Sequence, residues 1–237
     1  MPTAILIDGD FFLRRYRQIR GNKPPNIAAK ELLWMCHQHL HPRRKSSQGP
    51  SIPPRKLYRI FFYDCPPLSK KAHNPISETA IDFSKTPTAL WRNAFHNELR
   101  KMRKVALRLG YINERSGAWR IRPEKLIQIL RKEICVEDLT ETDVRYDAQQ
   151  KGVDMRIGID IASMAYKKQV DQIILVSGDS DFVPAAKLAR REGIDFILDP
   201  MWHPIRSDLH EHIDGLRSVF KKNEELQDSS SPNTVNH

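Results

Sequence analysis

Four aspartates follow two apolar runs of the sequence, and together they could bind a divalent metal ion. Asp8 and Asp10 follow the first run, and Asp179 and Asp181 follow the second. Short apolar runs of this kind indicate buried parallel strands, and ligands bind where such strands end. Several carboxylates gathered there cannot all stay ionised without a hard cation between them. The pattern therefore predicts a divalent-metal site.

A fifth aspartate, Asp154, begins a predicted helix after Lys151-Gly152-Val153. At about 100° per residue, Ile157 and Ile161 lie within about 80° of it, so we expect its carboxylate on the core-facing side. There it either caps the helix or reaches the sheet as a metal ligand. Asp160 lies on the flank of this helix and is interpreted as a residue that forms a salt bridge or supports a ligand.

The elements that would position these residues alternate between strands and helices, which predicts an α/β fold. We expect a central, mainly parallel sheet with helices on both faces, and a helix over residues 26–40. The strands are expected at residues 4–8, 57–63, about 142–147, 172–177 and 194–198.

We expect one domain over residues 1–222, with two inserted segments and a disordered tail. The insertions are predicted at about 42–56 and 65–135, because both carry prolines that interrupt the strand and helix patterns. The second insertion should contain a hairpin over 111–122, turning at Ser116-Gly117, and a short helix to about residue 132. Residues 223–237 are polar without a core pattern, which predicts disorder.

The charge of the chain favours a polyanionic partner. The 237 residues carry a formal net charge of +10, and basic surface around an acidic site suits a nucleic acid. A helix predicted over 91–109 would have one apolar face and one almost wholly basic face. A polar outer face alone would also explain that pattern. The basic residues predicted to contact substrate are Arg92, Arg100, Arg103, Lys104 and Lys151.

Other features exclude several classes of protein. No stretch approaches the roughly 18 apolar residues of a membrane span, and the N-terminus has no signal-peptide pattern, so we expect a cytoplasmic protein. Cys36, Cys65 and Cys135 match no zinc or redox spacing, which predicts free thiols. The alternating histidines near residue 39 are interpreted as surface residues.

Three segments together resemble the NYN domain, a branch of the PIN-like nucleases that includes the LabA-like proteins. They are Ile5–Gly9, Lys151–Asp154 with Asp160 six residues on, and Leu175–Pro184. The stretch from His203-Pro204 to Gly215 is similar to the closing segment of that family. The resemblance is close over the first strand and residues 143–219 and loose between them.

This resemblance implies a PIN-like three-layer sandwich and a ribonuclease that uses Mg²⁺ or Mn²⁺. Its acidic cluster falls on Asp8, Asp154, Asp179 and Asp181, and Ser177 is placed to hydrogen-bond a ligand carboxylate or the phosphate. Many members have Asn three residues after the first Asp, where this chain has Phe11. Asp10 is a candidate to replace that contact.

Two other functions fit parts of the sequence. Asp8-Gly9-Asp10 resembles the nucleophile motif of haloacid-dehalogenase phosphatases, but Phe12 stands where that motif has Thr or Val. A nucleic-acid-binding or regulatory protein without turnover is the alternative from another class, and Phe11 favours it. Mn²⁺ binding that depends on Asp179 would separate a working site from a binding module.

Overall fold

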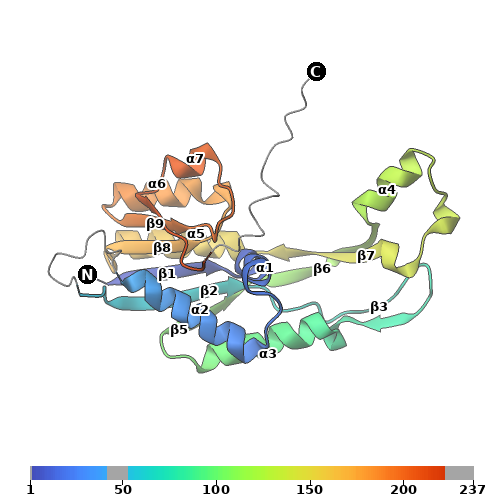
Figure 1. The fold of residues 1–237 in the computed structure, drawn as a ribbon, viewed down its shortest axis with the longest axis horizontal. Helices are drawn as coiled ribbons and strands as arrows, with labels where there is room; N and C mark the ends of the chain where they lie inside the picture. The colour runs from blue at the N-terminus through green and yellow to red at the C-terminus, as the bar shows by residue number, and fades with distance from the viewer. Residues whose placement is uncertain (1, 42–52, 222–237) are drawn as a thin grey trace, which may run out of the picture.

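The computed structural model describes residues 2–41 and 53–221, with the side chains of residues 114–116 left aside. Its centre is a six-stranded, wholly parallel sheet in the order β10-β9-β8-β1-β2-β5 (Figure 1). These strands are β1 (Thr3–Asp8), β2 (Leu57–Asp64), β5 (Val105–Leu109), β8 (Gln172–Val176), β9 (Asp195–Asp199) and β10 (Gly215–Leu216).

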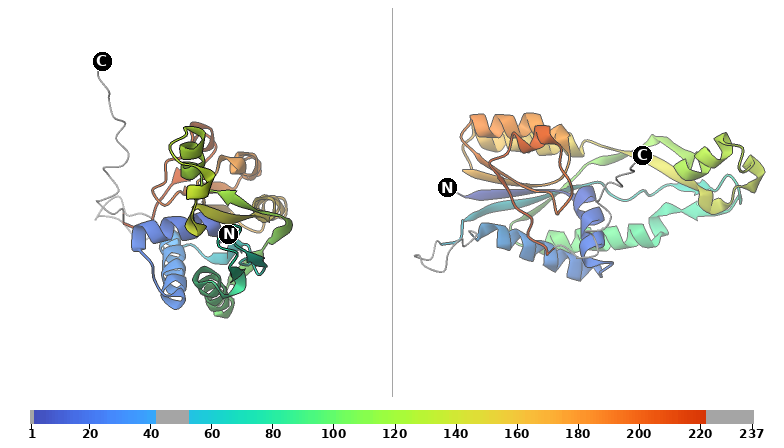
Figure 2. Two further views of the ribbon diagram at one scale, coloured as in Figure 1. Left: turned by 90° about the vertical axis from the view of Figure 1, so that its right-hand side faces the viewer. Right: turned by 45° about the horizontal axis from the view of Figure 1, so that its top comes forward.

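Helices cover both faces of the sheet, which makes three layers (Figure 2). One face is packed by α1 (Gly9–Arg20), α2 (Pro25–Leu40) and α3 (Pro87–Lys101), and the other by α5 (Val153–Tyr166), α6 (Val183–Arg191) and α7 (Ser207–His210). Successive residues of a strand point to opposite faces. Ile5 and Ile7 accordingly join the first core, and Ala4 and Leu6 join the second. The predicted PIN-like sandwich is confirmed.

A long arm leaves the sheet at its carboxyl edge, the edge at which the parallel strands end (Figure 1). The arm is built on an antiparallel strand pair, β6 (Tyr111–Ile121) with β7 (Val144–Lys151). The other arm elements are short: β3 (Lys71–His73), β4 (Ala80–Asp82), α4 (Pro123–Leu130) and the 3₁₀ turns η1 (Phe83–Lys85), η2 (Val136–Asp138) and η3 (Glu141–Asp143). The proline-bearing segment after Cys65 thus forms part of an ordered arm.

The helix predicted over 91–109 was wrong in its second half. α3 ends at Lys101, Lys104 takes a positive φ of 63°, and the chain continues as strand β5. Val105 and Leu107 pack against the core two residues apart, which is the period of a strand. Met102, Ala106 and Leu109 recur at spacings of four and three residues, which fits a helix, and for that reason the pattern misled.

The hairpin predicted over 111–122 was also wrong. Residues 111–121 form one strand whose partner is β7, with a register shift between Asn113 and Ala118. At the predicted turn, Gly117 lies so close to the Tyr146 ring that a Cβ there would be 2.5 Å from its hydroxyl oxygen. The predicted helix that follows is confirmed as α4.

Several smaller predictions can also be compared with the structure. The three cysteines are free, with Cys36 and Cys65 buried and Cys135 exposed. His39, interpreted as a surface residue, is buried against Asp199 at 2.8 Å. Within the described residues, no helix has the length and apolar character needed to cross a membrane. Most of the first predicted insertion and the whole predicted tail lie outside the described residues.

Candidate active site

The end of β1 places Asp8 at the carboxyl edge, where it begins α1. Its Oδ1 accepts a hydrogen bond from the backbone N–H of Phe11 at 3.2 Å, which caps the helix. The next residue must be glycine, because a Cβ on Gly9 would lie 2.5 Å from the carbonyl oxygen of Tyr63. The Asp-Gly pair therefore lets the chain turn sharply into the helix while Asp8 stays at the strand end.

Ser177 joins the two acidic turns directly. Ile7 pairs with Val176 in the sheet, so Asp8 and Ser177 are neighbours at adjacent strand ends. The Ser177 hydroxyl donates to Oδ2 of Asp8 at 3.3 Å and accepts from the backbone N–H of Asp179 at 3.2 Å. The hydrogen bond predicted from Ser177 to a candidate ligand carboxylate is therefore present at Asp8.

Asp179 and Asp181 lie in the turn that follows β8. The backbone N–H of Asp181 donates to Oδ1 of Asp179 at 3.0 Å, which shapes the 3₁₀ turn η4 (Ser180–Phe182). Both aspartates are exposed. The turn therefore holds its backbone in place while leaving two carboxylates accessible to solvent.

Asp154 approaches the same edge from the first turn of α5. Gly152, with φ 80°, makes the left-handed turn that starts this helix. Ile157 and Ile161 are buried as predicted, but Asp154 itself is exposed. Within the described residues its carboxylate makes no hydrogen bond or ion pair, so the expected core-side cap is absent and the side chain faces solvent at the site.

The pKa values show that these carboxylates influence one another. Burial raises the pKa of Asp8 to about 6; the hydrogen bond from Phe11 opposes this shift, and the charges of Asp154 and Asp10 add to it. The pKa of Asp154 is also raised, first by burial and then by the charges of Asp179 and Asp181. Mutual repulsion of this kind is what a bound cation relieves.

The donor set fits a hard divalent cation, because it consists of carboxylate oxygens on one edge of the sheet. Among the described residues, however, no three histidine, cysteine or acidic side chains are already close enough to hold a metal together. The structure thus gathers the predicted ligands at one edge without forming a closed coordination sphere.

Asp10 points toward basic residues. Its carboxylate lies 3.3 Å from Arg92 Nη2 and 3.3 Å from Arg14 Nε. Phe11, which stands at the usual Asn position, is buried. Asp10, the candidate to replace that contact, is therefore engaged in two ion pairs.

Arg92 is held by the buried carboxylate of Asp64, at the end of β2. Its Nε donates to Asp64 Oδ2 at 2.8 Å and its Nη2 to Oδ1. His96 Nε2 lies 2.7 Å from the same carboxylate. Burial pushes the pKa of Asp64 upward, but the contacts with His96 and Arg92 more than offset it and leave the pKa below its usual value. A rigid cation is thereby fixed beside the acidic edge.

Asp160 forms the salt bridge expected of it. It accepts a hydrogen bond from the Tyr63 hydroxyl at 2.7 Å and from Arg108 Nε at 3.0 Å. These contacts anchor α5 to strands β2 and β5 beneath the site.

The remaining predicted substrate contacts divide between the two edges. Lys151 ends β7 at the carboxyl edge, next to Gly152. Arg100, Arg103 and Lys104 lie where α3 leads into the start of β5, at the opposite edge of the sheet. The five residues of β5, at about 3.3 Å each, separate the two edges by roughly 16 Å. The structure does not bring these three residues to the acidic edge.

Sequence reasoning did not identify the aromatic pair beside the site. The rings of Phe11 and His203 meet edge to face with centroids 5.9 Å apart. Both press on Gly178, where a Cβ would lie 2.8 Å from Phe11 Cε2 and 2.9 Å from His203 Cδ2. Burial and the charges of Arg15 and Arg14 lower the pKa of His203. Because these residues lie far apart in the sequence, only the fold shows their contact.

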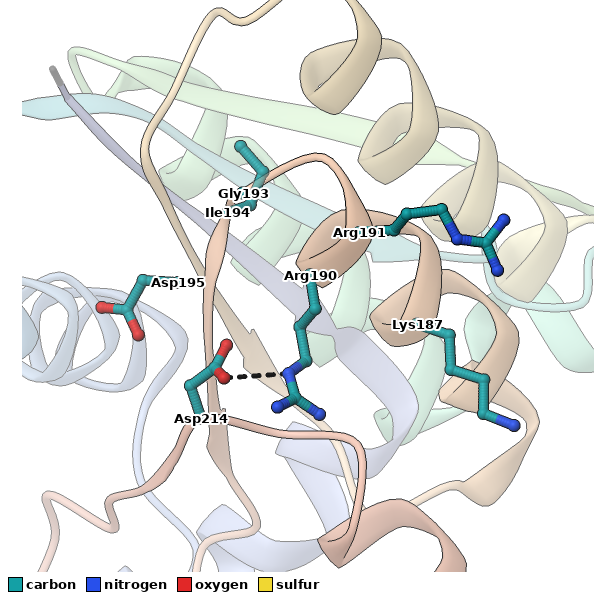
Figure 3. Close-up of a pocket in the computed structure, with 7 residues that line it drawn as sticks. All are labelled: Lys187, Arg190, Arg191, Gly193, Ile194, Asp195 and Asp214. Atoms are coloured by element: carbon teal, nitrogen blue, oxygen red, sulfur yellow. Dashed lines mark hydrogen bonds and ion pairs between the residues drawn. The ribbon is translucent and has the colours of Figure 1, made fainter.

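A depression of about 730 Å³ lies at the other end of β9, around Lys187, Arg190 and Arg191 (Figure 3). Arg190 Nε pairs there with Asp214 at 2.8 Å. Asp195, which also lines it, is the first residue of β9, so this depression opens at the amino edge. It is distinct from the acidic edge and has none of the predicted metal ligands in its lining.

Comparison with known proteins gives one family. The model of the NYN domain matches residues 79–203, more than half of the chain. The match includes Asp154, Asp179 and Asp181, while Asp8 precedes it. No curated protein matches the chain. A crystal structure of a protein of unknown function from Vibrio parahaemolyticus is similar with 18% identity and a TM-score of 0.47 over 92% of each chain, too distant to inform function.

Proposed function

The chain belongs to the NYN domain family, part of the PIN-like nuclease superfamily, and we propose that it is a metal-dependent ribonuclease. The observation that carries the proposal is the link through Ser177, whose hydroxyl binds Asp8 and the backbone of Asp179. It fixes two carboxylate-bearing strand ends side by side, at the edge where open α/β sheets bind their ligands.

Asp8, Asp154, Asp179 and Asp181 would hold the ion, Mg²⁺ or Mn²⁺. When bound, the ion would activate water and offset the negative charge that develops on the departing oxygen of a phosphodiester. Ser177 keeps Asp8 oriented toward the shared edge. Arg92, fixed by Asp64, lies beside the acidic edge as a cation for a neighbouring phosphate.

A cleavage assay on labelled single-stranded RNA tests this function. We expect cleavage with Mg²⁺ or Mn²⁺, none with excess chelator, and at least about a 100-fold lower rate in Asp179→Asn. Asp195→Asn is the matched control, because it removes a partly exposed carboxylate at the amino edge. Equal activity in the Asp179→Asn variant and the wild type, or cleavage without a divalent ion, would refute the proposal.

A nucleic-acid-binding protein without turnover is the second candidate. It is favoured by Phe11, which is buried against His203 and places no polar group at the usual Asn position. Asp10, the candidate to replace that group, is engaged by Arg14 and Arg92. RNA binding without cleavage under any divalent ion would select this function. Phe11→Asn would then be expected to gain Mn²⁺-dependent cleavage.

A further inference from the structure

The base of the arm contains a groove formed by two adjoining cavities, each of about 420 Å³. Both are lined by Pro67, Leu68 and Ile112, so they share a wall. The groove lies between the start of α3 and the strands β6 and β7, which run above that helix (Figure 1). The β6–β7 pair, which forms one side of the groove, is a separate sheet and not part of the central one.

The walls of the groove combine aromatic and apolar residues with polar ones such as Asn93, Thr88 and Gln150. Tyr111 is 59% exposed at one side. Tyr146 lines the other cavity, packed on Phe83 with ring centroids 5.3 Å apart. Lys70 donates a hydrogen bond of 2.7 Å to the hydroxyl of Tyr146. Tyr146 is covered by its neighbours, so Tyr111 is the exposed ring of this groove on which an unpaired base could stack.

Each of the two cavities has a lining residue next to the acidic edge. Arg92 lines it, is 14% exposed, and lies 3.3 Å from Asp10. On the other side, Tyr111 pairs with Lys151, the residue before the turn that begins α5 and presents Asp154. A nucleic-acid strand lying in the groove would therefore pass near the carboxylates. Asp147, the acidic residue in the lining, is paired with Arg120 at 3.1 Å.

We propose that this groove holds an unpaired segment of single-stranded RNA next to the bond to be cleaved. The inference rests on the proposed function for the choice of RNA. Charge favours a polyanion, since the chain carries a net +10. Arg92, in the lining, is paired with Asp64 and Asp10 and offers a guanidinium already held in place. Cavities of this size accept a base or a sugar, whereas a double helix keeps its bases stacked inside.

Fluorescence anisotropy with a labelled single-stranded RNA of about 12 nucleotides tests the groove without catalysis, in buffer containing EDTA. Tyr111→Ala removes an exposed stacking surface from the groove. Tyr166→Ala is the matched control, because that tyrosine is 64% exposed at the end of α5. We expect Kd to rise at least about fivefold for Tyr111→Ala and to stay within about twofold for Tyr166→Ala. Equal Kd values for the two variants would overturn the proposal.

A second pair of variants tests whether the phosphates of the bound RNA lie near the groove. Thr88→Glu places a negative charge in the groove at the first turn of α3, and Asn97→Glu places the same charge at an exposed position of that helix that lines neither cavity. An acidic residue in the first turn is compatible with the helix. Thr88→Glu should weaken RNA binding at least about threefold more than Asn97→Glu at low salt. The opposite order would refute the groove.

Two further probes test the choice of occupant. Single-stranded DNA and duplex RNA of the same sequence should each bind more weakly than single-stranded RNA, and tighter binding of either one overturns the proposal. The same experiments can refute the proposed ribonuclease activity independently of the groove. If Tyr111→Ala weakens binding in EDTA while no divalent ion gives cleavage, the groove stands and the catalytic proposal falls.

Discussion

Replacing the buried carboxylate that holds Arg92 should cost much of the stability of this fold. The side chains of Asp64 and His96 are 0% and 2% exposed, and Arg92 is 14% exposed. Asp64→Asn keeps the shape but removes the charge, so Arg92 loses its main partner inside the protein. Removal of one partner from a buried ion pair costs about 3–5 kcal/mol. Urea unfolding at pH 7 should show this as a midpoint lowered by about 1 M or more.

The matched control is Glu98→Gln on the same helix. Glu98 pairs with Lys101 at 32% and 69% exposure, so the change should cost about 0.5 kcal/mol or less. Equal losses in Asp64→Asn and Glu98→Gln would refute the reasoning, because they would mean that burial does not set the strength of the Asp64 contacts.

The pH dependence of the same variant gives a second check. The folded pKa of Asp64 is lowered from 3.8, so the ionised carboxylate contributes its full stability above the unfolded value. That contribution is lost as the pH falls through the lower, folded pKa. The difference in unfolding free energy between wild type and Asp64→Asn should stay constant from about pH 7 to 5 and shrink below about pH 4. A difference that grew on acidification would contradict the assigned direction.

The positions of the aspartates at the carboxyl edge could be predicted from the sequence, because fully buried parallel strands leave a plain signal. The strands before Asp8 and Ser177 are apolar on both faces, and their Asp-bearing ends therefore stand out. The start of α5 could also be predicted from the sequence, because Gly152 and the spacing of Ile157 and Ile161 indicate it. In each case the information lies within one short segment.

The arm and the Asp64 cluster could not be predicted in this way, because they depend on partners distant in sequence. β6 finds its partner more than twenty residues later, across α4. Arg92 and His96 read as one basic face of a helix until Asp64, contributed by β2, accepts hydrogen bonds from both. A pattern of charges predicts that partners exist, but the fold decides whether these are solvent, substrate or a buried carboxylate.

Three further predictions follow from local geometry. In thermal unfolding, Gly178→Ala should destabilise the protein by about 1–3 kcal/mol, because its Cβ would press on Phe11 and His203. Gly158→Ala in α5 meets no neighbour and should stabilise the protein by up to about 1 kcal/mol in the same assay. A thiol reagent should modify the exposed Cys135 quickly and the buried Cys36 and Cys65 only after unfolding, as followed by mass spectrometry. Finally, Asp8 should act as a ligand and not as a nucleophile, because Oδ1 accepts from Phe11 and Oδ2 from Ser177, so that both oxygens are held. Asp8→Asn should then lower Mn²⁺ affinity and RNA cleavage together, and no phosphate should be found on Asp8 after incubation with a phosphomonoester. An aspartyl-phosphate on Asp8 would instead assign the site to phosphatase chemistry, if Asp10→Asn abolished phosphomonoester turnover while RNA stayed uncut.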